Sequence, residues 1–384
     1  MNSRRLAFLL AAFIFSALVE SVPVLAQTAS IPVELRERAQ SEGRVRAIVE
    51  LRTGQAQVAE GRMSRAAAAA QRRRIRNAGD AVTARMQARN ARLMRRFESV
   101  PFVVLEVDTN ALDALAGDPD VVAVVEDRLL EPSLAESIPL VEADAAHGLG
   151  LDGSGTVVAI LDTGVDASHP FLAGKVVAEA CFASPGQAED PGDCPNGTDT
   201  QTGTGAGVPC SYVGCDHGTH VAGIAAGQDA SLTGVAPGAD LIAVQVFHAS
   251  NFCAVPPCPL AYGSDISAGL EYVYDLRDQY DIAAVNMSLG GGISSSSCDG
   301  LDPQMTAVID NLRSVEIATV VASGNDGVTG GLGFPACISS AISVAATDDS
   351  DLVAWFSNTS SDLDLFAPGV AIDSSVPGGQ FANF

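Results

Sequence analysis

The sequence predicts an α/β fold, in which helices cover both faces of a parallel sheet and a small α+β domain comes first. From residue 155 onward, short and nearly continuous apolar runs alternate with helical stretches, as is typical of strands buried on both faces of a parallel sheet. The expected strands are residues 156–161, 241–246, 283–287, 318–322 and 341–345. The expected helices are residues 218–227, 264–277 and 302–313. Functional groups in such sheets gather at the carboxyl ends of the strands.

The preceding unit contains no cysteine and reads as β-α-β-α-β, the pattern of a small α+β domain. Residues 62–98 are rich in Ala and Arg, contain no Pro and have a single Gly at position 79, so they predict one long helix. Residues 27–44 are polar and are expected to form a loose leader. The expected strands are residues 44–51, 100–107 and 121–126, with a short helix at residues 110–116.

The charge of the chain is divided unevenly between these two parts. Residues 1–136 hold 19 Lys and Arg against 17 Asp and Glu, a net charge of +2, whereas residues 137–384 hold 3 against 29, a net charge of −26. The two values sum to the −24 of the whole chain. An acidic unit of this kind repels nucleic acid and anionic membranes, so neither is expected as a partner.

The first 26 residues have the pattern of a secretory signal peptide. Arg4 and Arg5 precede a 14-residue apolar run at residues 6–19, and small residues at positions 24 and 26 suit cleavage after Ala26. The alternative is an uncleaved membrane anchor, for which the apolar run is short. We therefore expect an exported protein, extracellular or periplasmic, with no membrane segment after cleavage.

The cysteine count is even, and all eight cysteines follow residue 180. In an exported protein this pattern indicates disulfides, and we expect neighbours in the sequence to pair. Zinc is the alternative, because two of the expected pairs have the spacing of zinc ligands. The expected pairs are Cys181 with Cys194, Cys210 with Cys215, Cys253 with Cys258, and Cys298 with Cys337.

Two segments carry candidate catalytic side chains. Asp162 directly follows an apolar strand, where a carboxylate is held rigidly enough to orient a histidine; the alternative is a structural Asp in the turn. His217 begins a small-residue helix and can project toward the end of the sheet. His220 is the competing histidine, one helical turn further on and nearer the packed face. The two histidines lack the H-E-x-x-H form of metalloproteases.

Two further segments are weaker by themselves. Asn325 follows an expected strand, where its amide could donate to a developing oxyanion, although Asn-Asp-Gly is also a strong turn signal. Residues 288–291, with the sequence SLGG, follow another strand and offer exposed backbone that can pair with an extended peptide. The alternative there is a plain Gly-rich loop.

Together these segments resemble the ordered signatures of the subtilisin-like serine protease family, peptidase S8. The resemblance covers about residues 137–384 and is carried by AILDTGVDASHP, DHGTHVAGIAAG, NMSLGG, VVASGNDG and LFAPGV. It implies a doubly wound α/β/α sandwich and a chain divided into a signal peptide at residues 1–26, a propeptide at residues 27–136 and a catalytic domain at residues 137–384. The match to the family's inhibitory propeptide is the weaker one, because the expected helix is longer and richer in Arg.

The resemblance implies a role for each matching residue. Asp162 would orient His217, which would act as general base and then as general acid. Asn325 would stabilise the oxyanion; losing such a donor costs about 3 kcal/mol in subtilisin itself. The backbone of Ser288, Leu289 and Gly290 and of Ala322 and Gly324 would line the substrate cleft.

The family's nucleophilic serine has no counterpart in these 384 residues. The motif Gly-Thr-Ser-Met-Ala-x-Pro is expected soon after Phe384, so we expect a catalytic domain that is incomplete at its carboxyl end and inactive by itself. Ser288, Ser323 and Ser343 lack the context of a substitute nucleophile.

The expected protein is therefore a secreted serine endopeptidase precursor, which acts on polypeptides as a monomer and uses its own propeptide as an intramolecular chaperone and inhibitor. No cofactor is expected for catalysis. Structural calcium is compatible with acidic loops such as residues 189–199, where no metal ligands are assigned. The alternative function is a non-catalytic, peptide-binding protein. The arginines of residues 62–96 either complement the acidic domain or form a solvated helix face.

Overall fold

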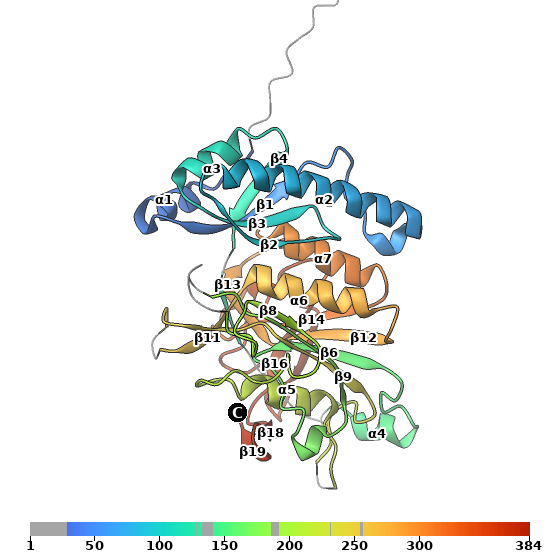
Figure 1. Cartoon of the computed structure of the whole chain (residues 1–384). Coiled ribbons are helices and arrows are strands. Elements are labelled where there is room, and N and C mark those ends of the chain that lie inside the picture. Colours follow the sequence, from blue (N-terminus) through green and yellow to red (C-terminus); the bar gives the residue numbers. More distant parts are fainter. Residues whose placement is uncertain (1–28, 128, 133–140, 186–191, 231, 254–255) are drawn as a thin grey trace, which may run out of the picture.

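The computed structural model describes residues 29–127, 129–132, 141–185, 192–230, 232–253 and 256–384. They form two units, with the N-terminal unit seated on helices α6 and α7 of the second unit (Figure 1). The expected signal peptide at residues 1–26 lies outside the described residues. None of the helices in the described ranges is long and apolar enough to cross a membrane.

The N-terminal unit is a four-stranded antiparallel sheet with helices packed on it, in the strand order β2-β3-β1-β4. Its strands are β1 (Val45–Leu51), β2 (Arg92–Arg96), β3 (Phe102–Val107) and β4 (Val121–Glu126). Its helices are α1 (Val33–Glu42), α2 (Arg65–Gln87), α3 (Thr109–Ala116) and the short 3-10 helix η1 (Glu60–Arg62).

Two expectations for this unit were wrong. Residues 27–44 are not all loose, because α1 forms there and buries Leu35 and Ala39 against the sheet. The single long helix over residues 62–98 is also not observed. The helix begins after Ser64, whose hydroxyl accepts the N–H of Ala67, and it ends at Gln87, shortly before the left-handed Asn90. The chain then returns as β2 alongside β3.

The second unit is built on an eight-stranded sheet with the strand order β17-β16-β14-β12-β6-β9-β7-β8, in which only the edge strand β8 runs antiparallel. Its strands are β6 (Val157–Asp162), β7 (Val176–Phe182), β8 (Thr200–Thr202), β9 (Asp240–Gln245), β12 (Ile282–Met287), β14 (Ala318–Ala322), β16 (Ile342–Thr347) and β17 (Leu365–Pro368). Its helices are α4 (Ala143–Gly148), α5 (His217–Ala226), α6 (Gly263–Leu276) and α7 (Pro303–Arg313), with a 3-10 turn η2 (Pro170–Leu172). The predicted parallel α/β fold is confirmed.

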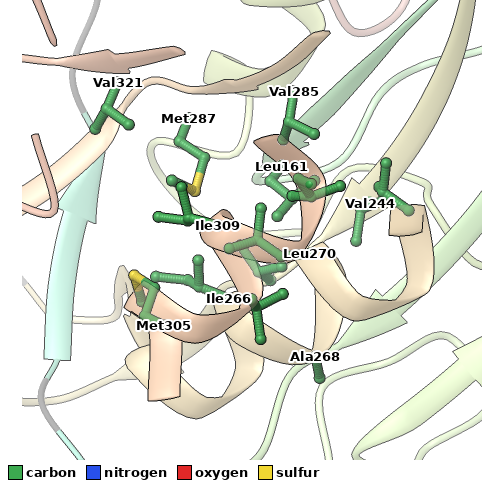
Figure 2. Close-up of a cluster of buried hydrophobic side chains, with 14 of the residues drawn as sticks. Leu161, Val244, Ile266, Ala268, Leu270, Val285, Met287, Met305, Ile309 and Val321 are labelled. Carbon is green, nitrogen blue, oxygen red and sulfur yellow. The ribbon is translucent and has the colours of Figure 1, made fainter. Parts of the chain in front are cut away.

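Helices cover both faces of this sheet. On one face, Leu161 and Val244 pack against Ile266 of α6 and Ile309 of α7, in the cluster that Figure 2 shows. On the other face, Ile160 packs with residues of α5. Because successive side chains of a strand point to opposite faces, Ile160 and Leu161 mark the two sides of the same strand.

A second, smaller sheet lies beside the first and has the order β10-β11-β5-β13-β15. All of its pairs are antiparallel. Its strands are β5 (Leu129–Pro132), β10 (His248–Ser250), β11 (Cys258–Tyr262), β13 (Leu289–Ser294) and β15 (Leu332–Phe334). A separate hairpin joins β18 (Asp373–Val376) to β19 (Gln380–Asn383).

Four disulfides are formed, and they are the expected neighbour pairs: 181–194, 210–215, 253–258 and 298–337. No cysteine is left free. The zinc alternative is therefore excluded for these cysteines in this structure, because a sulfur in a disulfide has no thiolate to offer a metal.

The two units meet through polar contacts on α6, and those around Ser264 are buried. Arg46 lies 2.8 Å from the Asp127 carboxylate, which in turn accepts both the N–H and the hydroxyl of Ser264 at the start of α6. Arg72 of α2 bonds Asp275 at 3.2 Å. The Glu271 carboxylate accepts the N–H of Ser99 at 2.8 Å. The arginine-rich helix α2 thus contributes to docking through Arg72. The more buried Arg46 lies outside that helix, in β1.

The core of the N-terminal unit provides a test of its packing. Val82 of α2 is fully buried, whereas Val33, at the start of α1, is 64% exposed. We expect Val82→Ala to lower the free energy of unfolding by about 2 kcal/mol, from lost burial and an unfilled cavity. Val33→Ala should change it by less than about 0.5 kcal/mol. Urea denaturation measures both, and equal effects would contradict this packing.

The docking of the two units should depend on pH through Glu271. Burial raises the pKa of Glu271, an effect larger than the opposing hydrogen bonds from Ser99. A carboxyl group whose pKa is raised in the folded state stabilises the fold below its ordinary pKa, and this contribution is lost as the pH rises through the raised value.

The variant Glu271→Gln keeps an acceptor for Ser99 but stays neutral at every pH. Its stability relative to the wild type should therefore increase between pH 5 and pH 8, as measured by denaturation across that range. The exposed Glu37→Gln serves as the control and should show no such trend. A pH-independent difference between Glu271→Gln and the wild type would refute this account.

Candidate active site

Asp162 is the last residue of β6, in the interior of the large sheet. Its side chain is fully buried, and its Oδ1 accepts the backbone N–H of Thr163 at 2.7 Å. The turn that follows requires glycine, because Gly164 has a φ of +98° and a Cβ there would come within 2.2 Å of the Val208 carbonyl oxygen. The carboxylate is thus fixed at the carboxyl end of a central strand, as predicted.

His217 is the first residue of α5, and its Nδ1 lies 2.6 Å from Oδ1 of Asp162. A carboxylate only accepts hydrogen bonds, so Nδ1 carries the proton and Nε2 of a neutral imidazole presents its lone pair. Among the described residues, Nε2 has no hydrogen-bond partner. The two side chains, 55 positions apart in the sequence, therefore meet with the second ring nitrogen left unpaired.

Thr163 joins the strand that ends in Asp162 to the helix that begins with His217. Its hydroxyl accepts the N–H of Gly218 at 2.9 Å and donates to the carbonyl of Cys215 at 3.3 Å. Glycine is required at position 218, where a Cβ would meet the Gly164 carbonyl oxygen at 2.4 Å. No such role of Thr163 was inferred from the sequence, although its position directly after Asp162 was a usable signal.

His220 faces away from this pair. Its Nε2 donates toward the carbonyls of Ile372 and Ala382, at 3.1 and 3.2 Å, and its ring stacks on Phe384 at 4.4 Å. Burial lowers the pKa of His220, which keeps the imidazole neutral. Its role is to hold the β18–β19 hairpin against α5, as expected for the more packed of the two histidines.

Asn325 lies exposed in the loop that follows β14. The buried side chain of Asn358 shapes this loop: its Oδ1 accepts the N–H groups of Asp326 and Val328 at 3.1 and 3.0 Å, and its Nδ2 donates to the carbonyl of Ser323 at 3.2 Å. Sequence reasoning missed Asn358, because nothing in its local sequence indicates a contact 30 positions upstream.

The SLGG segment, residues 288–291, pairs with an extended strand of the same chain. Leu289 and Gly290 of β13 pair with Pro132 and Glu131 of β5, and on its other edge β5 pairs with residues 261 and 262 of β11. The groove between β11 and β13 is therefore filled by a strand of the chain's own N-terminal part. Ser288, just before this strand, accepts a hydrogen bond from Asn286.

The segment from Ala322 to Gly324 lies one strand further from the groove. The carbonyl of Ser323 accepts the N–H of Gly333 in β15, which pairs with β13. The two predicted wall segments, 288–290 and 322–324, are thus joined through β15 rather than in direct pairing.

Metal ligation has no candidate in the described ranges: no group of three or more His, Cys, Asp or Glu is arranged to hold an ion there. The acidic loop at residues 189–199 lies partly outside those ranges.

A buried carboxylate that orients an imidazole with an unpaired Nε2, and a groove between two strands that holds an extended chain, are both features of peptidases. A model described as the subtilase family matches residues 153–383. The chain belongs to this family, whose members are serine endopeptidases.

Individual relatives agree with the family match. The chain is 34% identical over 297 residues to M-protease from Shouchella clausii (strain KSM-K16), covering 76% of the chain and 66% of that protein. It is 32% identical over 305 residues to subtilisin E from Bacillus subtilis (strain 168), covering 77% and 69%. It is 33% identical over 298 residues to alkaline elastase YaB from Bacillus sp. (strain YaB), covering 76% and 66%. The chain thus spans about two thirds of the length of these relatives.

The contacts of Thr163 generate a prediction about the site. Thr163→Val keeps the shape of the side chain but leaves the N–H of Gly218 and the carbonyl of Cys215 without their partner. We expect a loss of about 1–3 kcal/mol in the free energy of unfolding and a displaced or broadened NMR signal of the His217 Nδ1 proton. Thr163→Ser retains the hydroxyl and should preserve that signal. A Thr163→Val protein that matches the wild type in both measurements would exclude this bracing role.

Proposed function

We propose that this chain is the precursor of a secreted serine endopeptidase, in which Asp162 and His217 activate a serine located after Phe384. The observation that carries the proposal is the 2.6 Å contact between His217 Nδ1 and Asp162 Oδ1, together with the unpaired Nε2. Such an imidazole is oriented and ready to accept a hydroxyl proton at Nε2.

In the proposed reaction, His217 Nε2 removes the proton of the serine hydroxyl as the serine oxygen attacks the peptide carbonyl. The protonated imidazole then gives this proton to the leaving amine, and water repeats the sequence on the acyl-enzyme. The buried Asp162 carboxylate stabilises the imidazolium and holds its tautomer throughout.

The described serines considered as substitutes bond elsewhere, which supports a nucleophile outside these residues. Ser343 donates to Asp364 at 2.8 Å inside a strand, and Ser288 bonds Asn286 at 3.0 Å. The hydroxyl of Ser323 lies 3.4 Å from that of Ser357.

The proposed substrate is a polypeptide in extended form. It would add a strand between β11 and β13, where β5 now lies, so that its backbone bonds to Leu289 and Gly290. Asn325, in the exposed loop after β14, would donate to the oxyanion. The same occupancy supports an inhibitory role for the N-terminal unit, because a substrate cannot pair with these strands while β5 occupies them.

Two features support export. The first 26 residues have the pattern of a signal peptide, and four disulfides suit an oxidising compartment. We also propose that catalysis needs no cofactor, that the mature enzyme is a monomer, and that any calcium it binds has a structural role.

The full-length gene product tests the catalytic proposal by gelatin zymography. We expect clearing by the wild type and a loss of at least about a thousandfold in His217→Ala, because the general base is gone. The matched control is His147→Ala, on α4 and bonded to the Val235 carbonyl, which should retain activity. A folded and processed wild type that clears no gelatin would favour the alternative, a peptide-binding protein without catalysis.

A further inference from the structure

A basic side chain of the N-terminal unit enters the second unit, from here on called the catalytic unit, beside the first turn of α6. The guanidinium of Arg95, from β2, bonds Oδ1 of Asp265 through Nη2, which also lies 3.4 Å from the Ser184 hydroxyl. Asp265 is fully buried and the Arg95 side chain is 9% exposed. This ion pair is therefore enclosed.

The carboxylate in this contact is held by its own unit. Ser184, just after β7, donates its N–H to Oδ2 of Asp265 and its hydroxyl to Oδ1, both at 2.8 Å. The ring of Phe182 lies 5.4 Å from the central carbon of the Arg95 guanidinium. The walls of the site thus belong to the catalytic unit, whereas the cation comes from the N-terminal unit.

The catalytic unit has no described cation of its own to replace Arg95. Its sequence contains one Lys and two Arg, and each bonds elsewhere: Lys175 to the carbonyl of Pro237, Arg277 to that of Tyr274, and Arg313 to that of Ser339. Burial lowers the pKa of the neighbouring His248, so this imidazole is neutral. A buried carboxylate without a cation is costly, so removing Arg95 leaves a site that favours another one.

The site adjoins the groove where β5 lies. Tyr262, three residues before Asp265, ends β11 and pairs with Leu129 of β5. Ser264, the direct neighbour of Asp265, bonds Asp127, two residues before Leu129. A chain that enters the groove along the path of β5 therefore passes the first turn of α6.

We propose that Asp265, Ser184 and Phe182 form a guanidinium-binding subsite of the catalytic unit, which Arg95 fills in this chain and which accepts an arginine side chain of a polypeptide bound in the groove. The substrate part of this inference rests on the proposed peptidase function, whereas the binding of a guanidinium does not. A planar guanidinium suits the site, since it can bond a carboxylate and lie against an aromatic ring at the same time.

Guanidinium binding is tested on the full chain by a measurement that does not need enzyme activity. Arg95→Ala empties the site, and methylguanidinium is then added as the probe, with N-methylurea as a neutral probe of similar shape. We expect methylguanidinium to raise the thermal midpoint of Arg95→Ala by about 2–4 °C and N-methylurea to leave it unchanged. The control variant is Arg92→Ala, on the same strand, whose side chain is 45% exposed beside Glu106 and encloses no site. Methylguanidinium and N-methylurea should have the same effect on the thermal midpoint of Arg92→Ala.

The role of the carboxylate is tested by Asp265→Asn in the Arg95→Ala background, where methylguanidinium should bind at least about tenfold more weakly by calorimetry. Equal rescue by the two probes, or equal affinity with and without the Asp265 carboxylate, would overturn the subsite. If circular dichroism shows that Arg95→Ala does not fold, a double-mutant cycle with Arg95→Lys and Asp265→Asn measures the same coupling. Absence of coupling in that cycle would equally overturn it.

The substrate side of the proposal is tested on the full-length gene product with peptides that carry Arg or Gln at each position before the cleaved bond. We expect a preference for Arg at one position, reduced at least about tenfold in Asp265→Asn. An active enzyme without this preference would contradict the substrate role. An inactive gene product would contradict the proposed peptidase and with it the substrate role, whereas the methylguanidinium titration would still decide whether the site binds a guanidinium.

Discussion

The hydrogen bond between Asp162 and His217 is the contact around which this molecule is organised. It needs a strand that ends in the sheet interior, a helix that begins within reach of that end, and two glycines that let the backbones touch. Gly164 and Gly218 leave no room for a Cβ, and Thr163 bonds both sides of the junction. The parallel sheet provides these conditions because the carboxyl ends of its central strands all lie along the same edge of the sheet.

The N-terminal unit is arranged so that it complements the catalytic unit in two ways. The segment that follows its sheet, β5, pairs with the facing edges of β11 and β13, and its arginines supply cations to a unit that has almost none. Arg95 reaches the buried carboxylate of Asp265 in α6. Arg46, which is paired with Asp127 of its own unit, donates to the Ser264 hydroxyl at the start of α6. The opposite net charges of the two parts therefore correspond to specific contacts as well as to a general attraction.

The N-terminal unit also shows where local sequence was insufficient. Residues 92–96 have a helix-favouring composition, yet they form β2, because Asn90 turns the chain back and β3 offers an edge for pairing. Such a partner lies outside any local window of sequence. In the second unit the nearly continuous apolar runs are less ambiguous, and five predicted strands and three predicted helices are found within one or two residues of their expected ends.

The sequence by itself predicted the alternation of buried strands and helices, the places of Asp162 and His217 at the ends of their elements, and the pairing of cysteines 5 or 13 positions apart, because each depends on local pattern or short spacing. Only the tertiary structure decided which contacts join distant segments. The brace by Asn358, the strand that fills the groove and the entry of Arg95 beside Asp265 all link residues at least 30 positions apart. Such contacts depend on how whole elements pack, and a local pattern carries no record of that packing.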